Sequence, residues 1–260
     1  MGRIETAFSE LKRQGKKGFI PFITAGDPDL ETTLELLIEL SGATVIELGV
    51  PFSDPMADGP VIQRASERAL KHGLNVEDIL QVVATVRSEI ETPLILFSYF
   101  NPLLQFGLKR LAAEAKAAGV DGVLVTDLSP EEAGEFENEL RANDLDMIFL
   151  IAPTSTDERL KLIAQHARGF IYAVSRAGVT GVRTSVSAAA EKLVNRMRQF
   201  SSLPIAVGFG ISTAEQVKDV QRYADAVVIG SAIVSEIERL QGATANLAKR
   251  IGEFVKQVSD

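Results

Sequence analysis

The sequence has 260 residues, of which 46% are hydrophobic, so it can bury one large core. Its 27 basic and 35 acidic residues give a formal net charge of -8, a sign that disfavours nucleic acid and anionic membranes as partners. The absence of cysteine excludes disulfides, thiolate nucleophiles and cysteine-ligated metals, and no apolar run approaches the ~18 residues of a membrane span, so we expect a cytoplasmic protein.

The first segment has the pattern of an amphipathic helix. Ile4, Ala7, Phe8 and Leu11 fall on one face at helical spacing. We expect this helix to lie against the bottom of a larger core.

Eight short segments with strand character follow, and each precedes a helical stretch. The expected strands are residues 19–24, 44–49, 94–98, 122–126, 147–152, 170–175, 205–208 and 226–230. The expected helices include residues 30–40, 76–90, 103–118, 130–143, 157–167, 187–200, 214–222 and 232–258. This alternation favours an α/β fold, a closed parallel (β/α)8 barrel with an extra N-terminal helix, and no linker interrupts it. We therefore expect one domain, residues 1–260.

The second strand carries a carboxylate into the expected barrel interior. Side chains alternate along a strand, so Ile46 and Leu48 can pack under the helices while Glu47 points inward. Loss of solvation there should raise the pKa of Glu47 toward the range in which one group can both donate and accept a proton. The alternative is a structural glutamate paired with a basic side chain.

Two connections that follow strands are rich in turn-forming residues, 51–60 and 176–187. Loops after strands surround the active site of a barrel, so functional groups are expected there. In the first, Asp58 is a better candidate than Asp54 to face the barrel mouth, although an aspartate in that place can instead be a turn residue or the N-cap of a helix beginning near Val61. The second is expected to be a lid, or else an ordinary mobile surface loop.

Two glycine-containing turns suggest a phosphate site. Gly208, Phe209 and Gly210 follow the seventh strand, and Gly230 and Ser231 join the eighth strand to a helix. Glycine lets backbone N–H groups approach an anion, and barrels commonly hold phosphate at this pair of loops. The alternative is two ordinary tight turns.

The sequence gives no positive sign of a bound metal or nucleotide cofactor. No two histidines have ligand spacing, the phosphate-binding loop of nucleoside triphosphatases is missing, and the glycine turn at 208–210 lacks the third glycine of a dinucleotide site. We expect no metal and no cofactor on this chain.

Over essentially its whole length the sequence resembles the tryptophan synthase alpha subunit family. The most specific match is ELGVPFSDP at 47–55 followed by ADGP at 57–60. Further matches, in the family's order, are PFITAGDP at 21–28, SRAGVTG at 175–181, GFGIS at 208–212 and GSA at 230–232.

The resemblance implies a carbon–carbon lyase of tryptophan biosynthesis that cleaves indole-3-glycerol phosphate, by a retro-aldol reaction, to indole and glyceraldehyde 3-phosphate. It implies that Glu47 is the general acid-base and that Asp58 binds the indole N–H and balances the positive charge on the ring. It also places Tyr172 near the reacting centre. The implied substrate contacts are Phe22, Leu124, Leu150 and Val228 on the indole ring, Thr180 in the lid, and Gly181, Phe209, Gly210, Gly230 and Ser231 around the phosphate.

The resemblance also implies a partner, a beta subunit that carries pyridoxal phosphate, accepts indole directly and forms an α2β2 complex with this chain. Residues near Asp54 and Pro55 lie in the region that resembles the family's contact surface. Two alternatives share most of these residues: a stand-alone lyase that releases free indole, and a catalytically silent regulatory barrel. Retention of Glu47, Asp58 and Thr180 together argues against the silent barrel.

Overall fold

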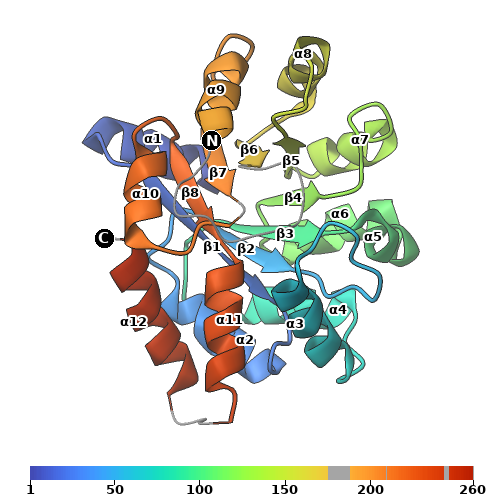
Figure 1. Ribbon diagram of the computed structural model, residues 1–260. Coiled ribbons are helices and arrows are strands. Elements are labelled where there is room, and N and C mark those ends of the chain that lie inside the picture. The colour runs from blue at the N-terminus through green and yellow to red at the C-terminus, as the bar shows by residue number, and fades with distance from the viewer. Residues whose placement is uncertain (175–187, 209, 243–245, 260) are drawn as a thin grey trace.

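The computed structural model describes residues 1–174, 188–208, 210–242 and 246–259. Its centre is a closed barrel of eight parallel strands in chain order, as the sequence predicts. Figure 1 shows the strands in a ring with the helices around them. The strands are β1 (Gly18–Thr24), β2 (Ile46–Gly49), β3 (Leu94–Ser98), β4 (Gly122–Val125), β5 (Asp146–Ile151), β6 (Ile171–Val174), β7 (Ile205–Gly208) and β8 (Ala226–Ile229).

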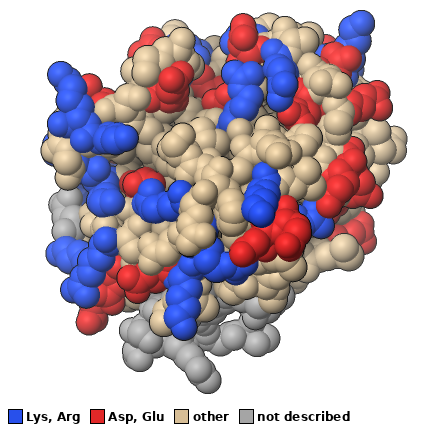
Figure 2. All heavy atoms as spheres, turned by 90° about the horizontal axis from the view of Figure 1, so that it is seen from above, with Lys and Arg blue, Asp and Glu red and all other residues tan. Residues whose placement is uncertain are grey.

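Twelve helices occur in the described residues: α1 (Arg3–Gln14), α2 (Leu30–Glu39), α3 (Pro60–Leu70), α4 (Val76–Val86), α5 (Phe100–Phe106), α6 (Leu108–Ala118), α7 (Gly134–Ala142), α8 (Asp157–His166), α9 (Ala188–Met197), α10 (Ala214–Gln221), α11 (Ser231–Leu240) and α12 (Leu247–Ser259). None of these combines the length and apolarity needed to cross a membrane. On the face seen in Figure 2, basic side chains are interspersed with acidic ones.

Two of the expected helices are each divided in two. The stretch 103–118 is split at Gly107, whose φ of 94° cannot continue a helix, so α5 ends and α6 begins there. The stretch 232–258 comprises α11 and α12, and Gly242 between them has a φ of 125°. Apolar residues recur on both sides of each glycine, which is why the sequence pattern predicted one helix in each case.

Alternation along the strands produces two hydrophobic cores. The larger lies between strands and helices and includes Ile46 and Leu48 of β2. The other fills the barrel interior and contains Ile20, Phe22, Ile95, Phe97, Leu124, Ile148, Phe170, Tyr172, Ala206, Ala226 and Val228. Each strand thus contributes alternate residues to the interior, as a closed barrel requires.

Helix α1 covers the end of the barrel at which the strands begin. Its Ile4 and Phe8 are buried with the interior residues, and the Phe8 ring lies 5.8 Å from that of Phe170, between ring centroids. This confirms the prediction that the first helix packs against the bottom of the core. The other end, where the strands finish, carries the loops with the predicted functional residues.

Candidate active site

Glu47 points into the barrel. Its neighbours on β2, Ile46 and Leu48, belong to the outer core, and its cross-strand partners Phe22 and Ile95 belong to the interior. The side chain is 1% exposed, and Oε1 has no hydrogen-bond partner among the described residues. The structural alternative of an ion pair with a buried basic side chain is therefore wrong for the part of the chain described.

The electrostatic consequence is a proton held more tightly. Burial raises the pKa of Glu47 well above its ordinary value, since the charged form would lose its hydration without gaining a compensating charge. A carboxyl group in this condition can donate a proton at neutral pH and take it back.

Asp58 lies at the barrel mouth and is held by a tyrosine. Tyr99 Oη donates a hydrogen bond to Asp58 Oδ2 at 3.1 Å and accepts one from the backbone N–H of Ala57 at 2.8 Å. Burial raises the pKa of Asp58, and the hydrogen bond from Tyr99 opposes that rise. Gly59, and not Asp58, is the N-cap of α3, so the helix-cap alternative for Asp58 is wrong.

An ion network anchors the helix that begins just beyond Asp58. Arg68 of α3 makes two hydrogen bonds, of 2.7 and 2.8 Å, to the buried carboxylate of Asp27 in the loop after β1. The same arginine contacts Glu238 of α11 at 2.8 Å, and Arg64 holds Glu238 with two bonds of 2.7 Å. The network fixes α3 against the helix that follows β8.

Tyr172 completes the polar groups of the interior. It is buried on β6, and its pKa is raised well above the ordinary value, first by burial and then by the charges of Glu47 and Asp58. A Cβ added at Gly208 on the neighbouring strand would lie 2.0 Å from Tyr172 Oη, so glycine at that position makes room for the phenol.

The predicted indole-binding side chains lie around these groups. Phe22, Leu124 and Val228 belong to the interior core, and Leu150 packs against it. The ring of Phe22 meets that of Phe97 edge-on at 5.2 Å, and Phe97 lies 6.5 Å from Tyr172, between centroids. A Cβ at Gly49 would meet the Phe22 ring at 2.6 Å, so this glycine also admits an aromatic side chain.

The two predicted phosphate turns leave adjacent strands at the same end of the barrel, since β7 pairs with β8. Gly210 is exposed and has a φ of 77°, a conformation that favours glycine. Gly230 is the N-cap of α11 and contributes no side chain, so the first N–H groups of the helix, beginning at Ser231, remain available to an anion. Phe209, Thr180 and Gly181 lie outside the described residues.

Reasoning from the sequence missed three residues at this site. Tyr99 holds Asp58, Phe97 lines the interior, and Thr24 lies with Asp58 beside a small pocket. Alternation along β1 and β3 could have identified Thr24 and Phe97, because they stand two positions from Phe22 and Ile95, which point inward. Tyr99 follows its strand, where alternation no longer applies.

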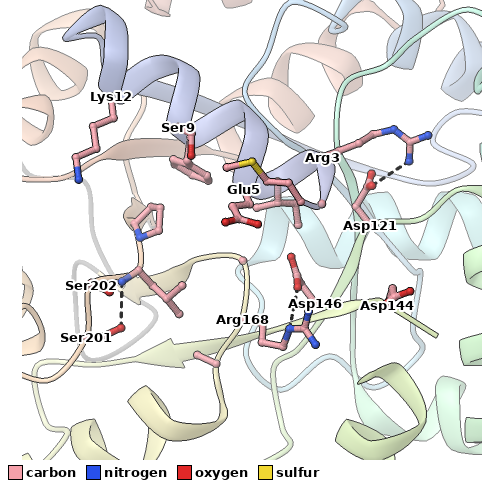
Figure 3. A pocket seen from close by; sticks show the side chains of 18 of the residues that line it. Arg3, Glu5, Ser9, Lys12, Asp121, Asp144, Asp146, Arg168, Ser201 and Ser202 are labelled. Carbon is pink, nitrogen blue, oxygen red and sulfur yellow. Dashed lines mark hydrogen bonds and ion pairs between the residues drawn. The ribbon is translucent and has the colours of Figure 1, made fainter. Parts of the chain in front are cut away.

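A much larger cavity, of about 1000 Å³, lies at the opposite end of the barrel. It is bounded by α1 and by residues that precede strands, among them Asp121 and Pro204. Its acidic and basic groups are partly paired with each other, as in the contacts of Arg3 with Asp121 and of Arg168 with Asp146 (Figure 3). It contains neither Glu47 nor Asp58, so its size does not make it the reaction site. In the described part of the chain, no three His, Asp or Glu residues form a group that could hold a metal ion.

Comparison with known proteins agrees with this geometry. Residues 8–260 match the sequence profile of the tryptophan synthase alpha chain. The tryptophan synthase alpha chain of Geobacter sulfurreducens is 50% identical over 263 aligned positions, which cover 100% of this chain and 98% of that protein.

Solved structures give the same relationship. Tryptophan synthase subunit alpha of Legionella pneumophila superposes with a TM-score of 0.91 at 39% identity, covering 100% of this chain and 97% of that one. A chain of the tryptophan synthase α2β2 complex from Pyrococcus furiosus gives a TM-score of 0.86 at 40% identity, with 93% and 97% coverage. The chain therefore belongs to the tryptophan synthase alpha chain family.

Proposed function

We propose that Glu47 is the proton carrier, and Asp58 the charge-stabilising group, of the reaction that this chain catalyses. As a tryptophan synthase alpha chain it is a lyase that cleaves indole-3-glycerol phosphate. The observation that carries the assignment is the inward, buried carboxyl group of Glu47, whose Oε1 has no partner among the described residues. Leaving such a group unpaired in a folded core costs free energy, which a role in binding or proton transfer explains.

The cleavage needs two proton transfers, one to the indole ring and one from the glycerol side chain, and a single carboxyl group can carry out both. Glu47 in its protonated form donates to the indole carbon that bears the glycerol side chain, which places a positive charge on the ring. The resulting carboxylate then takes the proton of the adjacent glycerol hydroxyl while the carbon–carbon bond breaks and its electrons return to the ring. Indole and the aldehyde are released, and Glu47 is protonated again.

Asp58 supplies the opposite charge. An anion that accepts a hydrogen bond from the indole N–H is stabilised most when the ring becomes cationic, so it binds the transition state better than the substrate. The hydrogen bond from Tyr99 keeps the Asp58 carboxylate in place. Tyr172, close enough for the charges of Glu47 and Asp58 to raise its pKa, is proposed to lie beside the reacting centre.

The substrate is held at both ends in this proposal. The side chains of Phe22, Leu124, Leu150 and Val228 enclose the indole ring in the apolar interior. The phosphate binds backbone N–H groups at Gly210, Gly230 and Ser231, where the uncapped start of α11 favours an anion. By the family resemblance, Phe209 and Gly181 complete the phosphate site and Thr180 closes over Asp58.

We infer that the partner is a tryptophan synthase beta subunit, which carries the pyridoxal phosphate, and that the pair assembles as α2β2 in the cytoplasm. The Pyrococcus relative is described as such a complex. Of the large hydrophobic side chains that are exposed among the described residues, two lie on segments next to Asp58 and Tyr99. They are Met56, 83% exposed in the loop before Asp58, and Leu104, 47% exposed on α5, the helix that follows Tyr99. A partner covering them would contact the two segments that hold Asp58. We also propose that residues 1–260 form one domain.

The test is indole formation from indole-3-glycerol phosphate by the purified chain, alone and with a purified beta subunit. We expect slow turnover alone, faster turnover with the partner, and co-elution of the two proteins on gel filtration. Full activity alone with no co-elution would favour a stand-alone lyase. No turnover in either condition would eliminate the assigned roles of Glu47 and Asp58.

A further inference from the structure

Thr24 has a buried hydroxyl group that lacks a partner. The side chain is 2% exposed, and Oγ1 makes no hydrogen bond with any residue that the structure describes. Thr24 ends β1 and stands opposite Gly49, two positions beyond the inward-pointing Phe22. Its side chain therefore points into the mouth of the barrel. Glu47 also points inward, from the neighbouring strand β2, where it stands opposite Phe22.

Thr24 is one of the residues that line a small pocket. The pocket has a volume of about 10 Å³, and its polar wall residues are Thr24, Asp58, Ser66, Ser98 and Tyr99. Ser98 Oγ already donates to the carbonyl oxygen of Tyr99 at 2.8 Å. The apolar part of the wall includes Phe22, Ile62 and Phe97.

The size and the wall chemistry of this pocket suit one water molecule. A buried water needs roughly 10–15 Å³ of accessible volume and two to four polar partners. The hydroxyl of Thr24, the carboxylate of Asp58 and the hydroxyl of Ser66 offer a donor, an acceptor and a group that can act as either. Indole is too large for a space of this size, and the pocket adjoins the proposed ring-binding interior at Phe22 and Asp58.

We propose that this pocket binds a single water molecule that accepts a hydrogen bond from Thr24 and donates one to the Asp58 carboxylate, which makes Thr24 a positioning residue for Asp58. The inference rests on the role proposed for Asp58. The water would hold the carboxylate from the side of β1, while Tyr99 holds it from the side of β3.

The water would also favour the charged form of Asp58. Burial raises the pKa of this carboxyl group, and the Tyr99 hydroxyl lowers it. Among the described residues, Glu47 and Tyr172 are the other titratable groups in this part of the interior, and neither provides a positive charge. The hydrogen bond that the water donates to the Asp58 carboxylate would add to the one donated by Tyr99. The two together would keep Asp58 ionised at lower pH.

The informative variants are Thr24→Val, which keeps the shape and removes the hydroxyl, and Thr24→Ser, which restores it. We expect Thr24→Val to lose activity on the acidic side of the pH profile of kcat/KM, by up to about 5-fold, the effect of one hydrogen bond, and to approach the wild type at higher pH. Thr24→Ser should regain most of the loss. Thr85→Val, on the exposed face of α4, is the matched control and should leave the profile unchanged.

A high-resolution crystal structure supplies the second measurement. The wild type should show density for one water between Thr24 and Asp58, and Thr24→Val should lack it. If Thr24→Val folds poorly, Ser66→Ala takes its place, and it should also lower kcat/KM on the acidic side of the pH profile. A wild-type profile for Thr24→Val, or a pocket without water in the wild type, would overturn the inference. Asp58→Asn separates the two proposals: if it is inactive while Thr24→Val is normal, only the water site is wrong.

Discussion

Tyr99 Oη donates a 3.1 Å hydrogen bond to Asp58 Oδ2, and Tyr99 Oη also accepts a hydrogen bond from the backbone N–H of Ala57. The phenol thus connects the segment after β3 with the loop after β2. The carboxylate proposed to balance the charge on indole is held by a side chain from the segment that follows the neighbouring strand β3.

We predict that Tyr99→Phe lowers kcat about 10-fold, because a hydrogen bond to a charged group is worth more than one between neutral groups. Steady-state indole release measures the effect. Tyr223→Phe is the control: its hydroxyl is buried without a partner among the described residues, and its loss should leave the rate unchanged. Equal rates for Tyr99→Phe and the wild type would show that Asp58 keeps its position unaided.

Gly208→Ala should disturb Tyr172, since the new methyl group would lie 2.0 Å from the phenolic oxygen. Overpacking of this kind costs about 1–3 kcal/mol of stability, and we expect a loss of activity as well because the phenol or β7 must shift. Denaturant unfolding and the indole assay test the two effects. Gly134→Ala, where a Cβ meets nothing within 4 Å, should be neutral or slightly stabilising. If both variants behave alike, the close packing of Tyr172 against β7 has no energetic importance.

The sequence was sufficient for the barrel and for the inward direction of Glu47, because both follow from alternation along short strands. It was insufficient for Tyr99, whose role depends on a contact between residues 41 positions apart. The same limit applies to Arg68, a surface-type residue on a helix that pairs with the buried Asp27. Local patterns carry no information about which loops meet, so the polar contacts that hold Asp58 required coordinates.

Removal of Arg68 tests the network behind α3. Arg68→Met leaves the buried carboxylate of Asp27 without its cation, and we predict a loss of about 3–5 kcal/mol in the free energy of unfolding at neutral pH. Arg159→Met is the control: its partner Glu131 and Arg159 itself are both exposed, so the loss should be about 0–1 kcal/mol. Similar losses in urea unfolding for the two variants would mean that the Arg68 pair is no more important than a surface contact.

The raised pKa of Glu47 has a consequence for stability. Above pH 4.5, the ordinary pKa of a glutamate, the unfolded chain loses this proton while the folded protein keeps it, so the wild type becomes less stable as pH rises toward the folded pKa. Glu47→Gln has no such proton. We predict that its stability relative to the wild type increases with pH in that window by about 1.4 kcal/mol per pH unit. Urea unfolding at several pH values measures this, and a constant difference from pH 5 to pH 8 would mean that the folded pKa is not raised.

The most direct test of the account is the rate of indole formation by Glu47→Gln at saturating indole-3-glycerol phosphate, measured with the beta subunit present. The amide keeps the shape of the side chain but cannot carry a proton. We predict a kcat at least ~100-fold below that of the wild type, the contribution expected of a general acid-base, with substrate binding largely retained. A variant that folds normally and turns over at a rate close to the wild type would show that the proton travels by another group, and the mechanism assigned to Glu47 would be wrong.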